Sequence, residues 1–292
     1  MESRLQEQIA NVVEKLKIKS QDYSSKNGMQ TGIEEIDACM RGISPGELVV
    51  LSAQRNMKTL IALNIISQIA ISQRIPSCYF SNDFLLNDII IQLLCCNSKI
   101  NLEDTYRGAI TLDDFNKLSS TSKSISSAPL FLKHVNTLSI ENVKNMSVNM
   151  KKKHGVKFIV VDFLHNLTCN NEFSSYEKFT GYVLRQLKNT AEHLNMSILA
   201  LYCNVEQNYH EQECLSGSEH FNILENNVDA LLDVRENKKA VSTNNLSAET
   251  AYAEILFANK IGELKFIEVP YQLASMNFLT DSAVKDMDEM PF

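Results

Sequence analysis

The residues with the clearest chemical potential lie at positions 52–64, SAQRNMKTLIALN, where a Lys-Thr pair separates an apolar run from a helical pattern. Strand, loop, Lys-Thr and helix is the layout of a phosphate-binding loop, in which the lysine reaches phosphate and the hydroxyl binds Mg²⁺. Such loops read G-x-x-x-x-G-K-[ST], yet no glycine occurs between Gly46 and Gly108. The pattern raises three alternatives: a working nucleotide site, the remains of one, or a coincidence.

Composition limits the class of protein. The chain has 292 residues, 44% hydrophobic and 22% charged, which is enough for one large domain or two small ones. The sequence contains neither a run of 18 apolar residues nor a signal-peptide pattern, so we expect no membrane partner. Seven cysteines without C-x-x-C spacing favour reduced thiols and a cytoplasmic location. With a net charge of -7, any nucleic-acid contact would need a local basic patch.

Apolar runs alternate with helical patterns from Thr31 onward, which predicts an α/β fold with a mainly parallel, twisted sheet and helices on both faces. The expected strands are 47–53, 77–81, 130–134, 157–162, 197–203, 230–234, 253–258 and 264–269. The expected helices are 60–73, 86–98, 112–122, 140–154, 176–194 and 221–226. Residues 235–250 are expected to form an exposed loop.

The two ends of the chain differ from its centre. Residues 4–18 predict an amphipathic helix with Leu5, Ile9, Val12, Val13 and Leu16 on one face. Such a stripe docks either on its own domain or on another subunit. We therefore expect a linker-like helix at 1–20, a folded domain at 28–272 and a disordered acidic tail at 279–292.

Several motifs, taken in order, resemble the RecA-like motor domain of DnaB-type hexameric replicative DNA helicases. They are TGIEEID at 31–37, GISPGEL at 42–48, MKT at 57–59, YFSND at 79–83, FIVVDFL at 158–164 and LENNVD at 224–229. The resemblance runs from Thr31 to Val269 and implies a RecA-like fold. It also implies a ring or filament of identical subunits.

The resemblance assigns roles to individual residues. The nucleotide loop would comprise Asn56, Met57, Lys58 and Thr59, and Thr59 and Asp162 would hold Mg²⁺. The family's glycine before the lysine is missing, and that glycine lets consecutive N–H groups point at phosphate. The family's general-base glutamate falls on Asp83, its glutamine relay on Cys203, and its K-x-R finger on positions 258–260, where only Lys260 is a cation. We therefore expect ATP and Mg²⁺ to bind weakly or not at all, and any ATPase to be impaired or inactive.

Partner contacts are suggested by other segments. The last residues, MDEMPF, resemble the acidic Pro-Phe tip of bacterial single-stranded DNA-binding proteins. In that tip a terminal Phe fills an apolar pocket and its carboxylate pairs with an arginine, so Pro291 and Phe292 are candidates for binding replication and repair proteins.

The loop at 204–217 carries three glutamates and no cation, which disfavours DNA there. A basic run at 151–154 is a candidate DNA contact or a solvated helix end.

These observations favour a DnaB-helicase-like replication or recombination protein with a degenerate nucleotide site, acting as a scaffold, a helicase partner or a regulator. Two alternatives stay open. One is an active ATP-dependent helicase or translocase with a variant loop. The other is a RecA-like recombination mediator that binds single-stranded DNA.

Overall fold

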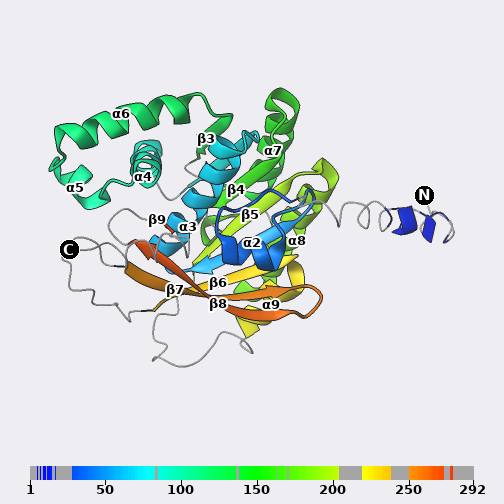
Figure 1. The fold of residues 1–292 in the computed structure, drawn as a ribbon. Helices are drawn as coiled ribbons and strands as arrows, with labels where there is room; N and C mark the ends of the chain where they lie inside the picture. Colours follow the sequence, from blue (N-terminus) through cyan, green and yellow to red (C-terminus); the bar gives the residue numbers. More distant parts are fainter. Residues whose placement is uncertain are drawn as a thin grey trace.

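A nine-stranded sheet forms the centre of the molecule, in the order β3-β2-β4-β5-β1-β6-β7-β8-β9 (Figure 1). The computed structural model describes residues 28–82, 85–135, 138–162, 164–169, 171–203, 219–237, 250–272 and 277–278, with isolated helical positions between 5 and 17. The strands are β1 (Leu48–Ala53), β2 (Ser77–Ser81), β3 (Leu130–His134), β4 (Phe158–Asp162), β5 (Ser197–Cys203), β6 (Ala230–Asn237), β7 (Thr250–Asn259), β8 (Leu264–Gln272) and β9 (Asn277–Phe278).

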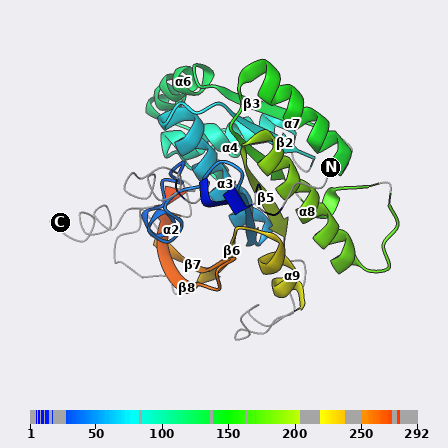
Figure 2. The same cartoon turned by 90° about the vertical axis from the view of Figure 1, so that its right-hand side faces the viewer.

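Helices cover both faces of this sheet, as Figure 2 shows. Each face of the sheet carries its own apolar core. Helices α2, α3 and α4 pack into the core on one face, and α7, α8 and α9 pack into the core on the other. The helical elements are α2 (Glu34–Met40), α3 (Arg55–Ser67), a π-helical turn (Gln68–Ser72), α4 (Leu86–Ser98), α5 (Leu102–Arg107), α6 (Leu112–Ser126), α7 (Ile140–His154), a 3-10 turn (Leu164–Asn166), α8 (Tyr176–Leu194) and α9 (Glu219–Asn227).

The pairing directions confirm the predicted fold class. Neighbouring strands pair in parallel along β3-β2-β4-β5-β1-β6, and they pair antiparallel along β6-β7-β8-β9. All residues of β1, β2 and β4 are buried, which explains why their sequences are almost continuously apolar. The carboxyl ends of β1, β2, β4 and β5 therefore meet at one edge of the sheet, where α/β proteins hold their ligands.

The expected strands and helices are present, with differences at their ends. The segment expected to be an exposed loop is partly strand: β6 continues through Asn237, and β7 begins at Thr250. The pairing of Asn237 with Tyr252 explains why, because each long strand supplies the other's backbone hydrogen bonds. Helices α2 and α5 and strand β9 were not expected. None of the described helices is long and apolar enough to cross a membrane.

Candidate functional site

The segment after β1 is helical where the sequence predicted a loop. Helix α3 begins at Arg55, five residues before the expected start, so the prediction of a loop through Thr59 is wrong. Gln54 is the extended N-cap, with φ -61° and ψ 153°. None of the residues from 54 to 59 has a positive φ. The chain turns directly from strand into helix, and no residue here adopts the left-handed backbone that a phosphate nest uses.

Backbone hydrogen bonding confirms that Lys58 belongs to the helix. Its N–H donates to the carbonyl of Gln54 at 2.9 Å, which is the ordinary bond of an α-helix. In a phosphate-binding loop, that donor would point toward the ligand. The backbone around Lys58 therefore offers no inward-facing cradle for a β-phosphate.

The side chain of Lys58 pairs with the aspartate that the sequence proposed for Mg²⁺. Its Nζ lies 2.6 Å from Oδ1 of Asp162, at the end of β4, and both side chains are fully buried. Burying two charges is costly, and their attraction offsets that cost only when the geometry is good and the remaining polar atoms are bonded. The pair places an ammonium group where Asp162 would otherwise face a metal ion.

Tyr79 completes the network, and the sequence analysis had not assigned it a role. The Tyr79 hydroxyl donates to Oδ2 of Asp162 at 2.7 Å, so both carboxylate oxygens are engaged. Tyr79 lies on β2 and is fully buried. A tyrosine in a strand that is buried on both faces was the available signal, because a buried hydroxyl requires a partner.

The other proposed nucleotide residues lie nearby but are enclosed. Met57 and Thr59 are buried, with exposed fractions of 7% and 2%. The side chain of Asn56 and the whole of Asp83 lie outside the described residues. Cys203 ends β5 and is half-buried. The described positions at the place where the sequence analysis put a nucleotide are therefore buried or half-buried in this structure.

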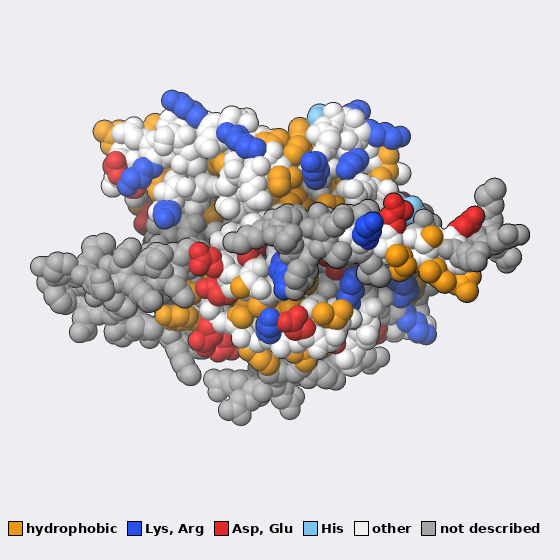
Figure 3. Space-filling view, turned by 45° about the vertical axis from the view of Figure 1, so that its right-hand side comes forward, with side chains coloured by type: hydrophobic (Ala, Val, Ile, Leu, Met, Phe, Trp, Pro, Cys, Tyr) orange, Lys and Arg blue, Asp and Glu red, His pale blue; other side chains and the backbone are white. Residues whose placement is uncertain are grey.

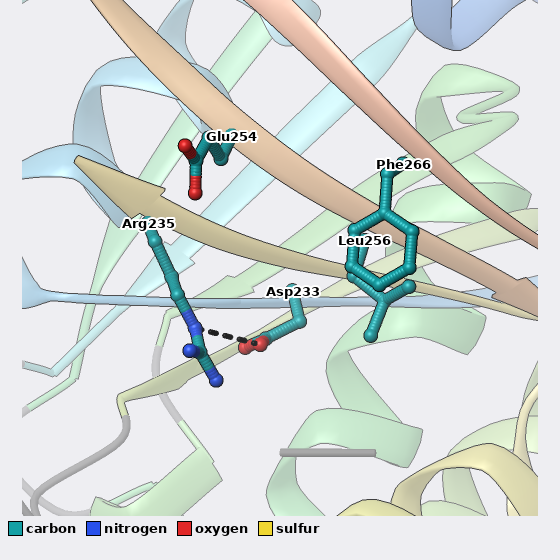
Figure 4. A pocket seen from close by; sticks show the side chains of 5 residues that line it. All are labelled: Asp233, Arg235, Glu254, Leu256 and Phe266. Carbon is teal, nitrogen blue, oxygen red and sulfur yellow. Dashed lines mark ion pairs between the residues drawn. The ribbon is translucent and has the colours of Figure 1, made fainter. Parts of the chain in front are cut away.

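A small cavity lies elsewhere, between β6, β7 and β8 (Figure 4). In this view Asp233 and Arg235 point toward one another, joined at 3.7 Å, and Phe266 lies beside Leu256. Burial raises the pKa of Asp233, although the Ser52 hydroxyl donates to it at 2.8 Å. The cavity measures about 40 Å³, which holds a few waters at roughly 10–15 Å³ each and is too small for a nucleotide.

Lys260, the remaining cation at the finger position, is bound within its own chain. It pairs with Asp229, which also accepts from Lys188 at 2.6 Å and from the N–H of Leu48 at 2.9 Å. Burial tends to raise the pKa of Asp229, but the hydrogen bonds from Lys188 and Lys260 hold it below its usual value. The resemblance placed Lys260 at the family's finger position; in the single chain its ammonium faces Asp229.

Two further sets of predicted contacts can be placed only in part. Pro291 and Phe292 lie outside the described residues. Of the N-terminal stripe, Leu5, Ile9 and Val12 are described as helical, and between 53% and 70% of each is exposed. The described part of the chain contains no group of three metal-binding side chains.

Comparison with known proteins gives one family and a consistent set of relatives. The family model described as "DnaB-like helicase C terminal domain" matches residues 28–280. The chain is 27% identical to the replicative DNA helicase DnaB of Treponema pallidum over 195 residues, which is 66% of this chain and 44% of that protein. It is 23% identical to DnaB of Leifsonia xyli, covering 68% of this chain and 43% of that protein.

Solved structures agree with this match. The chain superposes on a structure described as an ATPase domain with a TM-score of 0.78 at 19% identity, covering 96% of this chain and 99% of that one. A DnaB-like replicative helicase, described with its interactions with primase, gives a TM-score of 0.77 at 20% identity, covering 96% and 67%. These likenesses confirm the RecA-like fold. The chain spans less than half the length of the two bacterial relatives.

Proposed function

Because this chain belongs to the family of DnaB-like helicase C-terminal domains, we propose that it is a replication or recombination protein whose nucleotide site is closed. It acts as a scaffold, a helicase partner or a regulator rather than as a motor. The observation that carries this proposal is the buried ion pair between Asp162, at the end of β4, and Lys58, near the start of α3. Lys58 and Asp162 are the two groups that would bind a Mg²⁺-nucleotide, and here they bind each other.

Other features support the same conclusion. Lys260 is held by Asp229, and a lysine lacks the bidentate fork with which arginine stabilises a transferring phosphoryl group. Cys203 stands where the family has a glutamine and has no amide with which to relay a hydrogen bond. Each change alone would impair phosphoryl transfer. In combination they favour a protein that has kept the fold and the assembly surfaces but has lost ATP hydrolysis.

The proposal is tested by unwinding of a forked DNA duplex in the presence of ATP and Mg²⁺. We expect no strand separation above the nucleotide-free background, because the site does not hold the ligand that drives a motor. Unwinding that requires ATP and is lost in Lys58→Ala would establish the alternative of an active helicase. Stimulation of strand exchange between homologous DNAs, without ATP, would instead favour the recombination mediator.

We also propose a homo-oligomer, a ring or a filament, in which the N-terminal helix binds a neighbouring subunit. The exposed side chains of Leu5, Ile9 and Val12 support this, because burying such a stripe with Leu16 contributes on the order of 6 kcal/mol before ordering costs. The triple variant Leu5→Ser/Ile9→Ser/Val12→Ser is expected to lower the solution mass to that of a smaller species. Sedimentation or light scattering measures this mass.

A matched control uses the polar face of the same helix. Glu7 and Glu14 are exposed there, so Glu7→Ser/Glu14→Ser should leave the mass unchanged. If wild type is monomeric at high concentration, or if the triple variant keeps the full mass, the helix is not an assembly element.

The C-terminal tip is a further partner site in this proposal. Pro291 and Phe292 follow two acidic residues, Asp288 and Glu289, and supply the apolar groups that a tip-reading replication or repair protein would bind. Single-stranded DNA is also a proposed partner. A cytoplasmic location is proposed for a chain with these partners and with cysteines that lack C-x-x-C spacing.

A further inference from the structure

A basic cluster occupies the end of helix α7 and the start of the next strand. Lys151, Lys152 and Lys153 form the last turn of α7, and Lys157 precedes β4. Residues 138–161 contain five lysines but one acidic residue, Glu141, which lies at the opposite end of the helix. Figure 3 shows Lys and Arg side chains gathered on the upper right of the surface, over the region of α7. In a chain of net charge -7, this is a local excess of positive charge.

The lysines of this cluster are not neutralised within the described structure. Lys152, Lys153 and Lys157 are exposed, and none of them forms an ion pair with a described residue. Lys151 donates to the carbonyl of Asn195, which is neutral. By contrast, the lysines outside the cluster that pair with a carboxylate are Lys58, Lys117, Lys188, Lys260 and Lys265. The cluster therefore keeps its charge for an external anion.

An exposed ring adjoins the charges. His154, the last residue of α7, is exposed and packs on Phe131 of β3, with ring centroids 4.3 Å apart and planes inclined by 33°. Cations beside an exposed ring are the pairing that proteins use for single-stranded nucleic acid, whose phosphates need charge and whose bases need a stacking surface.

A helix end explains only part of this arrangement. Lysines in the last turn are favoured by the helix dipole, and Gly155 already caps α7 through bonds to the carbonyls of Lys151 and Met150. The dipole does not account for Lys157, which lies beyond the helix, or for the ring pair. We propose that the surface formed by Lys152, Lys153, His154 and Lys157 binds single-stranded nucleic acid, with the lysines contacting phosphates and His154 stacking on a base. This deepens, and rests on, the proposal that single-stranded DNA is a partner; it is independent of the closed site at Lys58, and base sequence is not read.

The test is anisotropy of a labelled oligothymidylate of about 15 nucleotides, with the full chain and no nucleotide. Three phosphate contacts predict that the logarithm of the binding constant falls with the logarithm of salt at a slope of about -2, or roughly 20-fold between 50 and 200 mM. Lys152→Glu/Lys153→Glu should weaken binding by at least about tenfold. The control Arg107→Glu/Lys117→Glu reverses the same number of charges on α5 and α6, at residues in exposed ion pairs, and should leave binding unchanged.

A second variant separates stacking from charge. His154→Ala should weaken binding of the single strand while leaving its salt slope unchanged, because it removes a stacking surface and no phosphate contact. The proposal is overturned if the control weakens binding as much as the lysine reversal, or if the chain binds no oligonucleotide. It is equally overturned if duplex DNA binds as tightly as the single strand, or if only an acidic peptide binds. None of these results bears on whether the Lys58 site holds ATP.

Discussion

Replacing Lys58 with alanine is expected to lower the free energy of unfolding by about 3–5 kcal/mol, because it strands the buried carboxylate of Asp162 without its cation. If Lys58 only bound a ligand, the same change would weaken the binding of that ligand and leave the free energy of unfolding almost unchanged. The effect is measured by chemical denaturation followed by far-UV circular dichroism, since the chain contains no tryptophan. Lys117→Ala is the matched control, because its pair with Asp113 is exposed, and it should not shift the unfolding curve.

A double variant separates the charge from the packing. Lys58→Met/Asp162→Asn removes both charges, keeps an apolar stem, and leaves an oxygen for the Tyr79 hydroxyl, so it should regain most of the lost stability. If Lys58→Ala unfolds at the same denaturant concentration as wild type, the ammonium is solvated in solution. In that case the site is open.

Inserting glycine between Met57 and Lys58 is expected to raise the affinity for ATP by at least about tenfold, equivalent to 1.4 kcal/mol. The added residue restores the length of the loop and supplies a backbone that reaches positive φ, so consecutive N–H groups can point at phosphate. It also shifts the start of α3, which separates Lys58 from Asp162. Binding of a fluorescent ATP analogue reports the change.

Inserting alanine at the same position is the control for this experiment. It adds the same length of chain, but its Cβ disfavours the left-handed backbone and intrudes where the β-phosphate would lie. Equal gains from glycine and alanine would show that loop length alone limits binding. No gain from either would show that the changes at Cys203 and Lys260 close the site by themselves.

Most of the fold followed from the sequence because burial leaves a strong pattern. Strands such as β4, FIVVD, are buried on both faces and read as unbroken apolar runs, so they were placed to within a residue. Short elements leave weaker patterns in the sequence. Helix α5 spans six residues, none of which is buried, so it has no apolar periodicity. Its start is fixed by Asn101, whose side chain accepts from the N–H groups of Glu103 and Asp104. The extension of β6 to Asn237 depends on a partner strand that is remote in sequence.

The candidate site was foreseen in its residues but not in its geometry. The sequence identified Lys58 and Asp162, and a missing glycine, yet it did not indicate that helix α3 would start at Arg55. The helix start depends on which backbone conformations the remaining residues favour, and the ion pair depends on β1 and β4 being separated by β5 alone in the sheet. Tyr79 reaches Asp162 through a different contact, the pairing of β2 with β4.

The most direct test of a closed nucleotide site is a calorimetric titration of the wild-type protein with ATP and Mg²⁺. If Lys58 and Asp162 occupy each other in solution, no binding heat should appear at ATP concentrations up to about 1 mM, and Lys58→Ala should behave in the same way. A dissociation constant in the micromolar range, lost in Lys58→Ala, would contradict the closed site and establish Lys58 as a phosphate ligand.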